Sequence, residues 1–370
     1  MAAPTYEASL VAVSYASSGP PTFTEVCGLI PIAGGVRFID QLGLPGQLDL
    51  EVQVDSIEPV GTARLRDLSV APCEVWLRRG GTSIVFAGPV TGCHLHDRTI
   101  TITAPGLLKY LEYWMADVNV LTALNGSAAT EYMFSGIDQA VIVQRLADAW
   151  QGLAYGHDGI VTTGLSATGI TRDLTLSARD GKYIMPLMTE MGGRNNGFDL
   201  SVDPNTRKLT MWSPRKGTDR TTGPAAVILD RRSIGVPDLS WTVAPGQIGS
   251  EVFASSNSTQ GVTLTSIRSN TVLRATFGRS YISRSYQDIS VQATLDDHAQ
   301  RTVDDNSTQV FTAAPELLPV PGFAYGDFAV GDLILYSFDG GVGEQTFTTR
   351  VGSIEVSTGT GRELLKVGLL

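Results

Sequence analysis

Residues 47–55 read Gln-Leu-Asp-Leu-Glu-Val-Gln-Val-Asp, a strict alternation of polar and apolar side chains. Because successive side chains of a strand point to opposite faces, this period of two predicts a strand with one buried face. Residues 99–104, with the sequence Thr-Ile-Thr-Ile-Thr-Ala, repeat the pattern. These two stretches predict that the surrounding part of the chain is β.

Residues 1–104 are predicted to form one β-barrel domain around these strands. Glu74–Arg78 and Ser83–Ala87 flank Arg79-Gly80-Gly81-Thr82, and the two glycines of this linker accept the positive φ angles that hairpin turns require. Short strands with turn residues about every ten positions are typical of a small barrel or sandwich.

The apolar pattern changes between residues 105 and 235. Apolar side chains recur at helical spacing in residues 107–114, 137–150 and 183–191. Pro186 lies inside the third pattern and predicts either a kink or a later start of that helix. Residues 198–211 surround Asp203-Pro204-Asn205-Thr206, which indicates a hairpin. We therefore expect an inserted α+β domain over residues 105–235.

Residues 236–370 return to strand patterns and are predicted to form a second β-barrel domain. One exposed helix is expected near residues 295–305, because Thr294 and Asp297 have capping-box spacing and apolar residues follow at every fourth position. The predicted fold class is therefore mainly β (α+β), with two β-barrels flanking an inserted α+β domain.

The composition excludes several classes of function. The 370 residues are 42% apolar and only 17% charged, with 40 Gly and 18 Pro, which favours short strands and tight turns. Acidic residues outnumber basic ones 37 to 27, and the net charge of −10 is unfavourable for general binding of nucleic acid or anionic membranes. No stretch reaches the roughly 18 apolar residues of a membrane span. We expect no specific DNA binding and no membrane span.

Charge is segregated along the chain. Residues 207–232 hold seven bases and two acids, whereas residues 286–345 hold ten acids and one base, Arg301. The two stretches are either solvated faces or complementary surfaces that meet between subunits or partner proteins. The second interpretation gives the candidate interface residues Arg215, Lys216, Arg231, Arg232, Asp296, Asp297, Asp304 and Asp305.

The sequence predicts no catalytic, metal-binding or cofactor-binding site, and so no enzyme. His94 and His96 lie on one face of a strand, but no third ligand for a catalytic zinc is obvious. A P-loop, a dinucleotide fingerprint and a nucleophile elbow are all missing. The carboxylate pairs Asp296-Asp297 and Asp304-Asp305 each lie on adjacent helical positions and should diverge, whereas glycosidases need carboxylates that converge on a sugar.

Cysteines and tryptophans are both interpreted as core residues. The three cysteines, Cys27, Cys73 and Cys93, contain no C-x-x-C pair, and one disulfide with a leftover thiol is the alternative. Four tryptophans lie in apolar segments, namely Trp76, Trp114, Trp212 and Trp241. Aromatic residues on β-scaffolds also bind sugars, so a carbohydrate-binding module remains an alternative function.

A series of segments occurs in a characteristic order along most of the chain. The segments are Val75–Arg78 with Ser83–Val90, Thr99–Ala104 with Leu107–Trp114, Arg172–Leu174 with residues 181–192 and Asn196–Asp203, and Val330–Leu335 with Arg350–Ile354. In this order they resemble the baseplate hub of phage tails, and more specifically the tail-tip hub proteins, or minor tail proteins, of long-tailed phages that infect actinobacteria.

The resemblance implies a structural virion protein at the tail tip, made in the cytoplasm of the bacterial host. A homotrimer with two tube-like barrels per copy would cap the tail tube, adapt six-fold to three-fold symmetry and form part of the DNA exit channel. The implied partners are further copies of the chain, a distal tail protein or tube ring above, the tape measure protein in the lumen, and a tail-tip fibre or other minor tail proteins below. The alternatives are a receptor- or cell-wall carbohydrate-binding tail module and a tail-associated cell-wall hydrolase.

Overall fold

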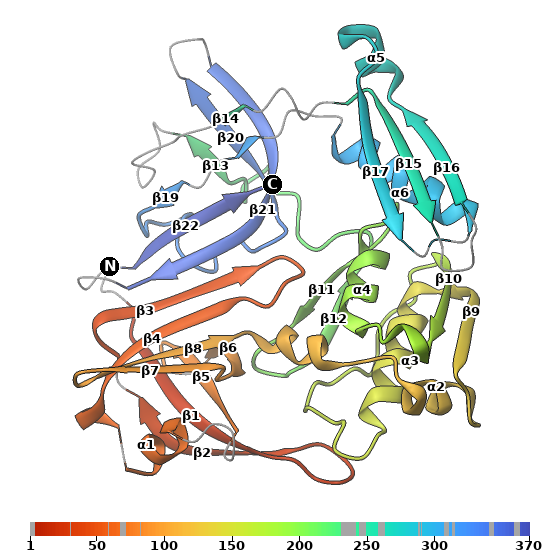
Figure 1. The fold of residues 1–370 in the computed structure, drawn as a ribbon. Helices are drawn as coiled ribbons and strands as arrows, with labels where there is room; N and C mark the ends of the chain where they lie inside the picture. The colour runs from red at the N-terminus through yellow and green to blue at the C-terminus, as the bar shows by residue number, and fades with distance from the viewer. Residues whose placement is uncertain are drawn as a thin grey trace.

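The computed structural model, drawn in Figure 1, describes most of the chain. The described residues are 4–29, 31–57, 59–66, 72–81, 83–230, 242–243, 249–257, 263–287, 289, 291–306, 311–312, 315–339, 344–358 and 363–370. Their secondary structure is mainly β, as the sequence predicts.

The first β region consists of two sheets that share one apolar core. One sheet has the strand order β2-β1-β5-β6, and the other contains the run β3-β4-β8-β7. The elements are β1 (Tyr6–Ser14), β2 (Thr22–Leu29), β3 (Pro31–Gln41), β4 (Gln47–Gln53), η1 (Val54–Ser56), α1 (Pro59–Arg66), β5 (Cys73–Arg79), β6 (Ser83–Pro89), β7 (Gly92–His96) and β8 (Thr99–Pro105). The hairpin predicted around Gly80-Gly81 is confirmed by the antiparallel pairing of β5 with β6.

The alternating stretch at 47–55 forms the strand β4 over its first seven residues. Leu48, Leu50 and Val52 are fully buried, while their neighbours are exposed or half-buried. β4 pairs with β8 so that Leu50 lies opposite Ile102, which places the apolar faces of both predicted strands on the same core. Burial of each such side chain contributes about 1.5–3 kcal/mol.

The second β region is joined to the first by the long strand β21. The first half of β21 pairs with β20, and its second half lies between β22 and β3. The elements are β13 (Ile228–Asp230), β19 (Glu316–Leu317), β20 (Leu333–Asp339), β21 (Glu344–Ser357) and β22 (Leu364–Leu369). Both regions thus share a nine-stranded sheet and one core, and among the described strands no sheet closes on itself. The two-barrel arrangement stays a prediction.

Residues 105–230 hold a second core. Their elements are η2 (Leu107–Tyr113), α2 (Val118–Asn125), β9 (Glu131–Asp138), α3 (Gln139–Gln151), β10 (Thr171–Ser177), η3 (Ala178–Asp180), α4 (Ile184–Gly192), β11 (Asp199–Val202) and β12 (Leu209–Trp212). The three predicted helices are present, the first as a 3-10 helix. α4 begins at Ile184, one residue after the start of the predicted pattern, and Pro186 lies in its first turn, where a missing backbone N–H breaks no hydrogen bond within the helix. The predicted hairpin is β11–β12.

Residues 249–306 form a separate lobe with a small core of its own. The elements are β15 (Glu251–Asn257), β16 (Thr263–Ser269), α5 (Thr271–Phe277), β17 (Tyr281–Gln287) and α6 (Gln292–Asp305). Two short strands on either side of the lobe in the sequence, β14 (Thr242–Val243) and β18 (Phe311–Thr312), pair with each other. In Figure 1 this lobe lies above the α+β part, and the second β region lies above the first. The predicted division at residues 104 and 235 stays a prediction.

The helix predicted near residues 295–305 is present as α6, but two of its expected features are wrong. It is not an exposed helix, because Leu295, Ala299 and Val303 are buried against the sheet of β15–β17. The capping box is also wrong, because α6 begins earlier, at Gln292, and Thr294 lies inside its first turn. The buried apolar face, rather than a cap, therefore determines the extent of the helix.

The expectation that all three cysteines are buried is wrong for Cys93. Cys27 and Cys73 are buried, whereas Cys93 is exposed, and no disulfide joins these three described cysteines. Cys93 lies on β7, which among the described strands pairs with β8 alone and so forms an edge, and the four residues from Cys93 to His96 are exposed. In the described parts of the chain, every helix is too short or too polar to cross a membrane.

Candidate functional site

The basic stretch at residues 207–232 contributes two of its side chains to buried contacts. Arg207 donates hydrogen bonds to both carboxylate oxygens of the fully buried Glu74, at 2.8 and 3.0 Å. Arg220 donates at 2.7 Å to Asp332, which is also buried. Both arginines connect segments more than a hundred residues apart, so they anchor the fold rather than supply a free basic surface.

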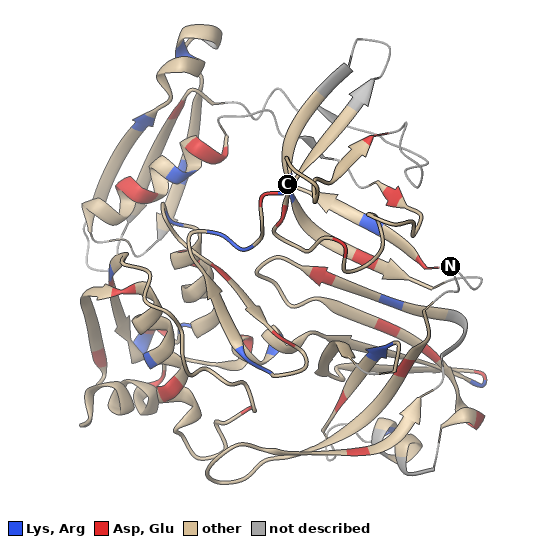
Figure 2. Cartoon of the chain, turned by 180° about the vertical axis from the view of Figure 1, so that it is seen from behind, with Lys and Arg blue, Asp and Glu red and all other residues tan. Residues whose placement is uncertain are grey.

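Two of the predicted interface bases lie where the α+β part meets the second β region. Arg215 is half-buried and lies 3.9 Å from Asp199. The Lys216 backbone N–H donates to Asp199 at 2.8 Å, and the Lys216 carbonyl accepts from Arg350 at 2.7 Å. Figure 2 shows the Lys and Arg residues of this connection close to the C-terminus. Two further predicted interface residues lie outside the described residues: Arg231 and Arg232.

Asp296 and Asp297 on α6 point to different partners, as expected for adjacent helical residues. Asp296 accepts a hydrogen bond from Ser266 at 2.6 Å and lies 2.8 Å from Arg268. The Ser266 hydroxyl, with further help from Gln292 and Arg268, lowers the pKa of Asp296 below its usual range. Asp297 pairs with the buried Arg172 of β10 at 3.0 Å.

The other two acidic candidates have partners on their own helix. Asp304 accepts from Gln300 at 3.0 Å, and Asp305 pairs with Arg301 at 2.8 Å. All four acidic candidates on α6 are therefore engaged within the chain. Their role in an interface with another subunit stays a prediction.

A polar cluster that the sequence analysis missed connects α6 to α4, with His298 and Arg194 buried and Glu190 exposed. The ring of His298 is buried, and its Nε2 lies 3.5 Å from the Glu190 carboxylate. Glu190 also pairs with Arg194 at 2.9 Å. Burial raises the pKa of Glu190, but His298 and Arg194 outweigh this effect and lower it to about 2. With Arg172 and Asp297, this cluster holds the 249–306 lobe on the α+β part.

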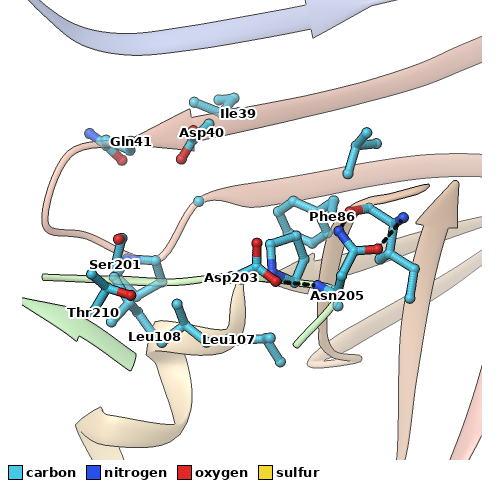
Figure 3. Close-up of a pocket in the computed structure, with 18 of the residues that line it drawn as sticks. Ile39, Asp40, Gln41, Phe86, Leu107, Leu108, Ser201, Asp203, Asn205 and Thr210 are labelled. Carbon is cyan, nitrogen blue, oxygen red and sulfur yellow. Dashed lines mark hydrogen bonds between the residues drawn. The ribbon is translucent and has the colours of Figure 1, made fainter. Parts of the chain in front are cut away.

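A cavity of about 500 Å³ lies where the α+β part meets both β regions (Figure 3). One side is the end of β3 with its following turn, and the others are β6, the start of η2 and the β11–β12 hairpin. The residues that line it are Ile39, Asp40, Gln41, Leu44, Pro45, Gly46, Ser83, Ile84, Val85, Phe86, Ala87, Gly106, Leu107, Leu108, Ser201, Val202, Asp203, Pro204, Asn205, Thr210, Trp212, Lys216 and Tyr325.

The β11–β12 hairpin has one apolar and one polar face. Leu200 and Leu209 are buried in the second core, and the alternating residues Ser201, Thr210 and Trp212 line the cavity. The Trp212 side chain is 42% exposed, and its indole N–H donates to Ser201 at 3.0 Å.

The prediction that the tryptophans are core residues is therefore wrong for Trp212. Trp114 is buried, and Trp76 packs against the same core at its edge. Trp241 lies outside the described residues. Trp212 differs because the period of two places it on the polar face of its hairpin.

The hairpin is fixed to β6 by a single side chain. The amide of Asn205 accepts from the Ile84 N–H at 2.8 Å and donates to the Ile84 carbonyl at 2.9 Å. Asp203 in turn accepts from the backbone N–H groups of Asn205 and Thr206, at 3.0 and 2.7 Å, and so shapes the turn. This wall of the cavity is consequently held by directional bonds.

Two carboxylates face the cavity from opposite sides. Figure 3 shows Asp40 on the β3 side and Asp203 beside Asn205 on the hairpin side, with Ser201 and Thr210 together farther along the hairpin. Burial raises the pKa of Asp40, and the nearby Lys216 opposes this shift. The cavity thus combines acidic, hydroxyl and aromatic groups.

His94 and His96, the two histidines considered as possible metal ligands, are not grouped with a further metal-binding side chain among the described residues. His94 and His96 are exposed on β7. Among the described residues, no group of three His, Cys, Asp or Glu side chains is arranged to hold a metal ion.

Comparisons of the fold give a consistent result. No protein-family model and no curated protein matches the sequence. The 43 kDa tail protein of prophage MuSo2 from Shewanella oneidensis matches 99% of this chain over 98% of its own, with a TM-score of 0.63 and 13% identity. The chain has the fold of phage tail proteins. A tail protein from Neisseria meningitidis MC58 matches 98% of the chain over 96% of its own, with a TM-score of 0.57 and 14% identity.

A third solved structure extends the same likeness to another host. The prophage tail protein gp18 from Listeria monocytogenes EGD-e matches 97% of the chain over 94% of its own, with a TM-score of 0.54 and 10% identity. The match covers nearly the whole chain in each case, so all parts described above belong to the phage tail fold. The resemblance to phage tail proteins stated from the sequence is therefore confirmed. At this level of identity the likeness concerns the fold and assigns no role to a single residue.

Proposed function

We propose that the protein is a structural component of the phage virion, the baseplate hub at the tip of a long tail. The observation that carries this proposal is the match of the whole chain to phage tail proteins. In the proposed assembly three copies form a ring that caps the tail tube.

The junction of the two β regions supports the proposed symmetry. β3 pairs with β21, and Arg37 of β3 donates to Glu355 of β21 at 2.7 Å across this junction. The two regions also share one core, so they form a rigid pair. Three copies would present six β units to a six-fold tube while remaining three-fold below it.

The proposed position defines partners by their place along the tail. A distal tail protein or tube ring would lie above, the tape measure protein would occupy the lumen, and a tail-tip fibre or other minor tail proteins would lie below. DNA would leave through the ring. The net charge of −10 per chain suits this role, because each Lys or Arg that lines the bore would bind phosphates and slow the passage of DNA.

Counting copies in purified virions tests the proposal. We expect the protein in isolated tails, at the tip, as a ring of three copies in a three-fold averaged reconstruction by electron cryomicroscopy. Its recovery only from lysate fractions without tails, or a ring of six copies, would contradict the hub assignment.

A further inference from the structure

The cavity beside the β11–β12 hairpin has properties that assembly alone does not explain. Its volume of about 500 Å³ falls within the range of sites for small ligands, roughly 300–1,000 Å³. We propose that this cavity binds a short, neutral saccharide between Trp212, Asp40 and Asp203. The proposal is independent of the hub assignment, because it rests on the residues of the cavity and not on the fold.

The aromatic and apolar groups of the cavity suit the C–H faces of a sugar ring. Trp212 lines the cavity while 42% exposed, and its hydrogen bond to Ser201 fixes the orientation of the indole ring. Phe86 and Leu108 are buried and supply apolar surface in the same cavity. A rigid aromatic face of this kind gains free energy when an apolar surface covers it.

The polar groups suit the hydroxyls of the same ligand. Asp40 is half-buried at the cavity and accepts a backbone hydrogen bond from Gln41 but no side-chain hydrogen bond from the described residues, so its carboxylate can still accept from hydroxyl donors of a ligand. Asp203 uses Oδ1 for its turn, whereas Oδ2 accepts no hydrogen bond from the described residues, and the side chain lies on the hairpin side of the cavity (Figure 3). Gln41 and Thr210 add groups that both donate and accept.

The charge of the cavity distinguishes between ligand classes. Two carboxylates, Asp40 and Asp203, disfavour an anion such as phosphate. Lys216 lines the same cavity and offsets part of their charge, which weakens the attraction for a cation. A neutral ligand with many hydroxyl groups is the class that uses both carboxylates and the ammonium.

The walls of the cavity are formed before any ligand arrives. The double hydrogen bond between Asn205 and Ile84 holds the hairpin, and the buried residues Leu107 and Leu108 hold the start of η2. Binding therefore requires little ordering of the protein, and this lowers its entropic cost.

Saturation-transfer NMR and calorimetry on the full-length protein test the proposal. The probes are maltotriose, cellotriose and triacetylchitotriose, with N-acetyl-lysine methylamide as a cationic comparison. We expect millimolar binding of at least one trisaccharide and none of the amine. Trp212→Ala should weaken that binding at least about tenfold, which corresponds to 1.4 kcal/mol. Tyr155→Ala, which removes an aromatic side chain that is 66% exposed and does not line the cavity, is the matched control and should bind normally.

A second variant distinguishes loss of saccharide binding from loss of folded structure. Asp40→Asn keeps the size of the side chain and removes its charge, and it should also weaken saccharide binding while the thermal unfolding midpoint stays close to that of the native protein. Binding of none of the three saccharides overturns the proposal, as does binding of the amine alone or saccharide binding that survives both substitutions. The copy number measured in virions is unaffected by these outcomes, so failure here is distinguishable from failure of the hub assignment.

Discussion

At the scale of single residues, buried ion pairs carry much of the specificity of the fold. Glu74 is fully buried and accepts from Arg207, from the Trp76 indole at 2.8 Å and from the Tyr110 hydroxyl at 2.6 Å. These partners come from β5, η2 and the turn before β12. One carboxylate thus fixes the position of the α+β part on the first β region.

Replacement of Glu74 by alanine is expected to destabilise the protein by about 3–5 kcal/mol, because the guanidinium of Arg207 would remain buried without its partner. Glu25→Ala is the matched control, since it breaks the more exposed pair with Arg78 and should cost less than about 1 kcal/mol. Urea unfolding of both variants measures the difference. Equal losses in the two variants would show that Glu74 is not an anchor.

The cavity residues show how little of a site a single sequence reveals. The Asp-Pro-Asn-Thr turn is predictable from its composition, but the bond of Asn205 to Ile84 is not, because 121 residues separate them. Trp212 has an apolar neighbourhood in the sequence and yet belongs to the polar face. Asp40 follows Ile39 and belongs to no recognisable sequence motif, so nothing in the local sequence marks it as a cavity residue.

At the scale of elements, α6 is the main connection of the 249–306 lobe to the rest of the chain. Its apolar face packs on β15–β17, and its charged side meets α4 and β10 through His298 and Asp297. The docking of this lobe therefore depends on a few polar contacts.

Asp297→Ala should loosen this docking, because Arg172 is only 8% exposed and would lose its carboxylate partner. We expect faster hydrogen exchange in α6 and β15, with a loss of about 1–3 kcal/mol in the free energy of opening that lobe. Asp305→Ala breaks a more exposed pair with Arg301 and serves as the control. Unchanged exchange in the Asp297 variant would mean that apolar packing alone holds the lobe.

Acid should weaken the same docking through Glu190. Its folded pKa of about 2 lies below the ordinary glutamate value of 4.5, so the carboxylate stabilises the folded state above pH 4.5. That contribution is lost as the pH falls from 4.5 toward 2, and it is modest because the side chain is 45% exposed. Glu190→Gln should have a lower free energy of unfolding than the native protein at pH 6. This difference between the two proteins should shrink as the pH falls from 4.5 toward 2. A difference in the free energy of unfolding that stays constant with pH would contradict stabilisation by the ionised Glu190 carboxylate.

Most local elements follow from the sequence, whereas the pairings between them do not. The alternation around Leu50 and the helical stripe that includes Leu146 determine a strand and a helix, because each pattern fits one period only. The parallel pairing of β15 with β17 and the pairing of β3 with β21 join segments that no local pattern relates. Cys93 is misassigned for the same reason, since its exposure depends on β7 being an edge strand.

At the scale of the whole molecule, the two β regions form one rigid pair within a phage tail fold. The pair is held by the β3–β21 junction and by one continuous core, and the α+β part and the 249–306 lobe are attached beside it. A rigid pair is what a three-fold ring needs in order to present six β units.

The mass of the assembled particle tests this central claim most directly. Light scattering after size-exclusion chromatography gives that mass for the purified protein alone and mixed with the tail protein that lies next to it. We expect three chains of 39.4 kDa in the complex, either preformed or assembled on contact with the neighbour. A dimer or tetramer that persists across concentrations and in the presence of the neighbour would contradict it.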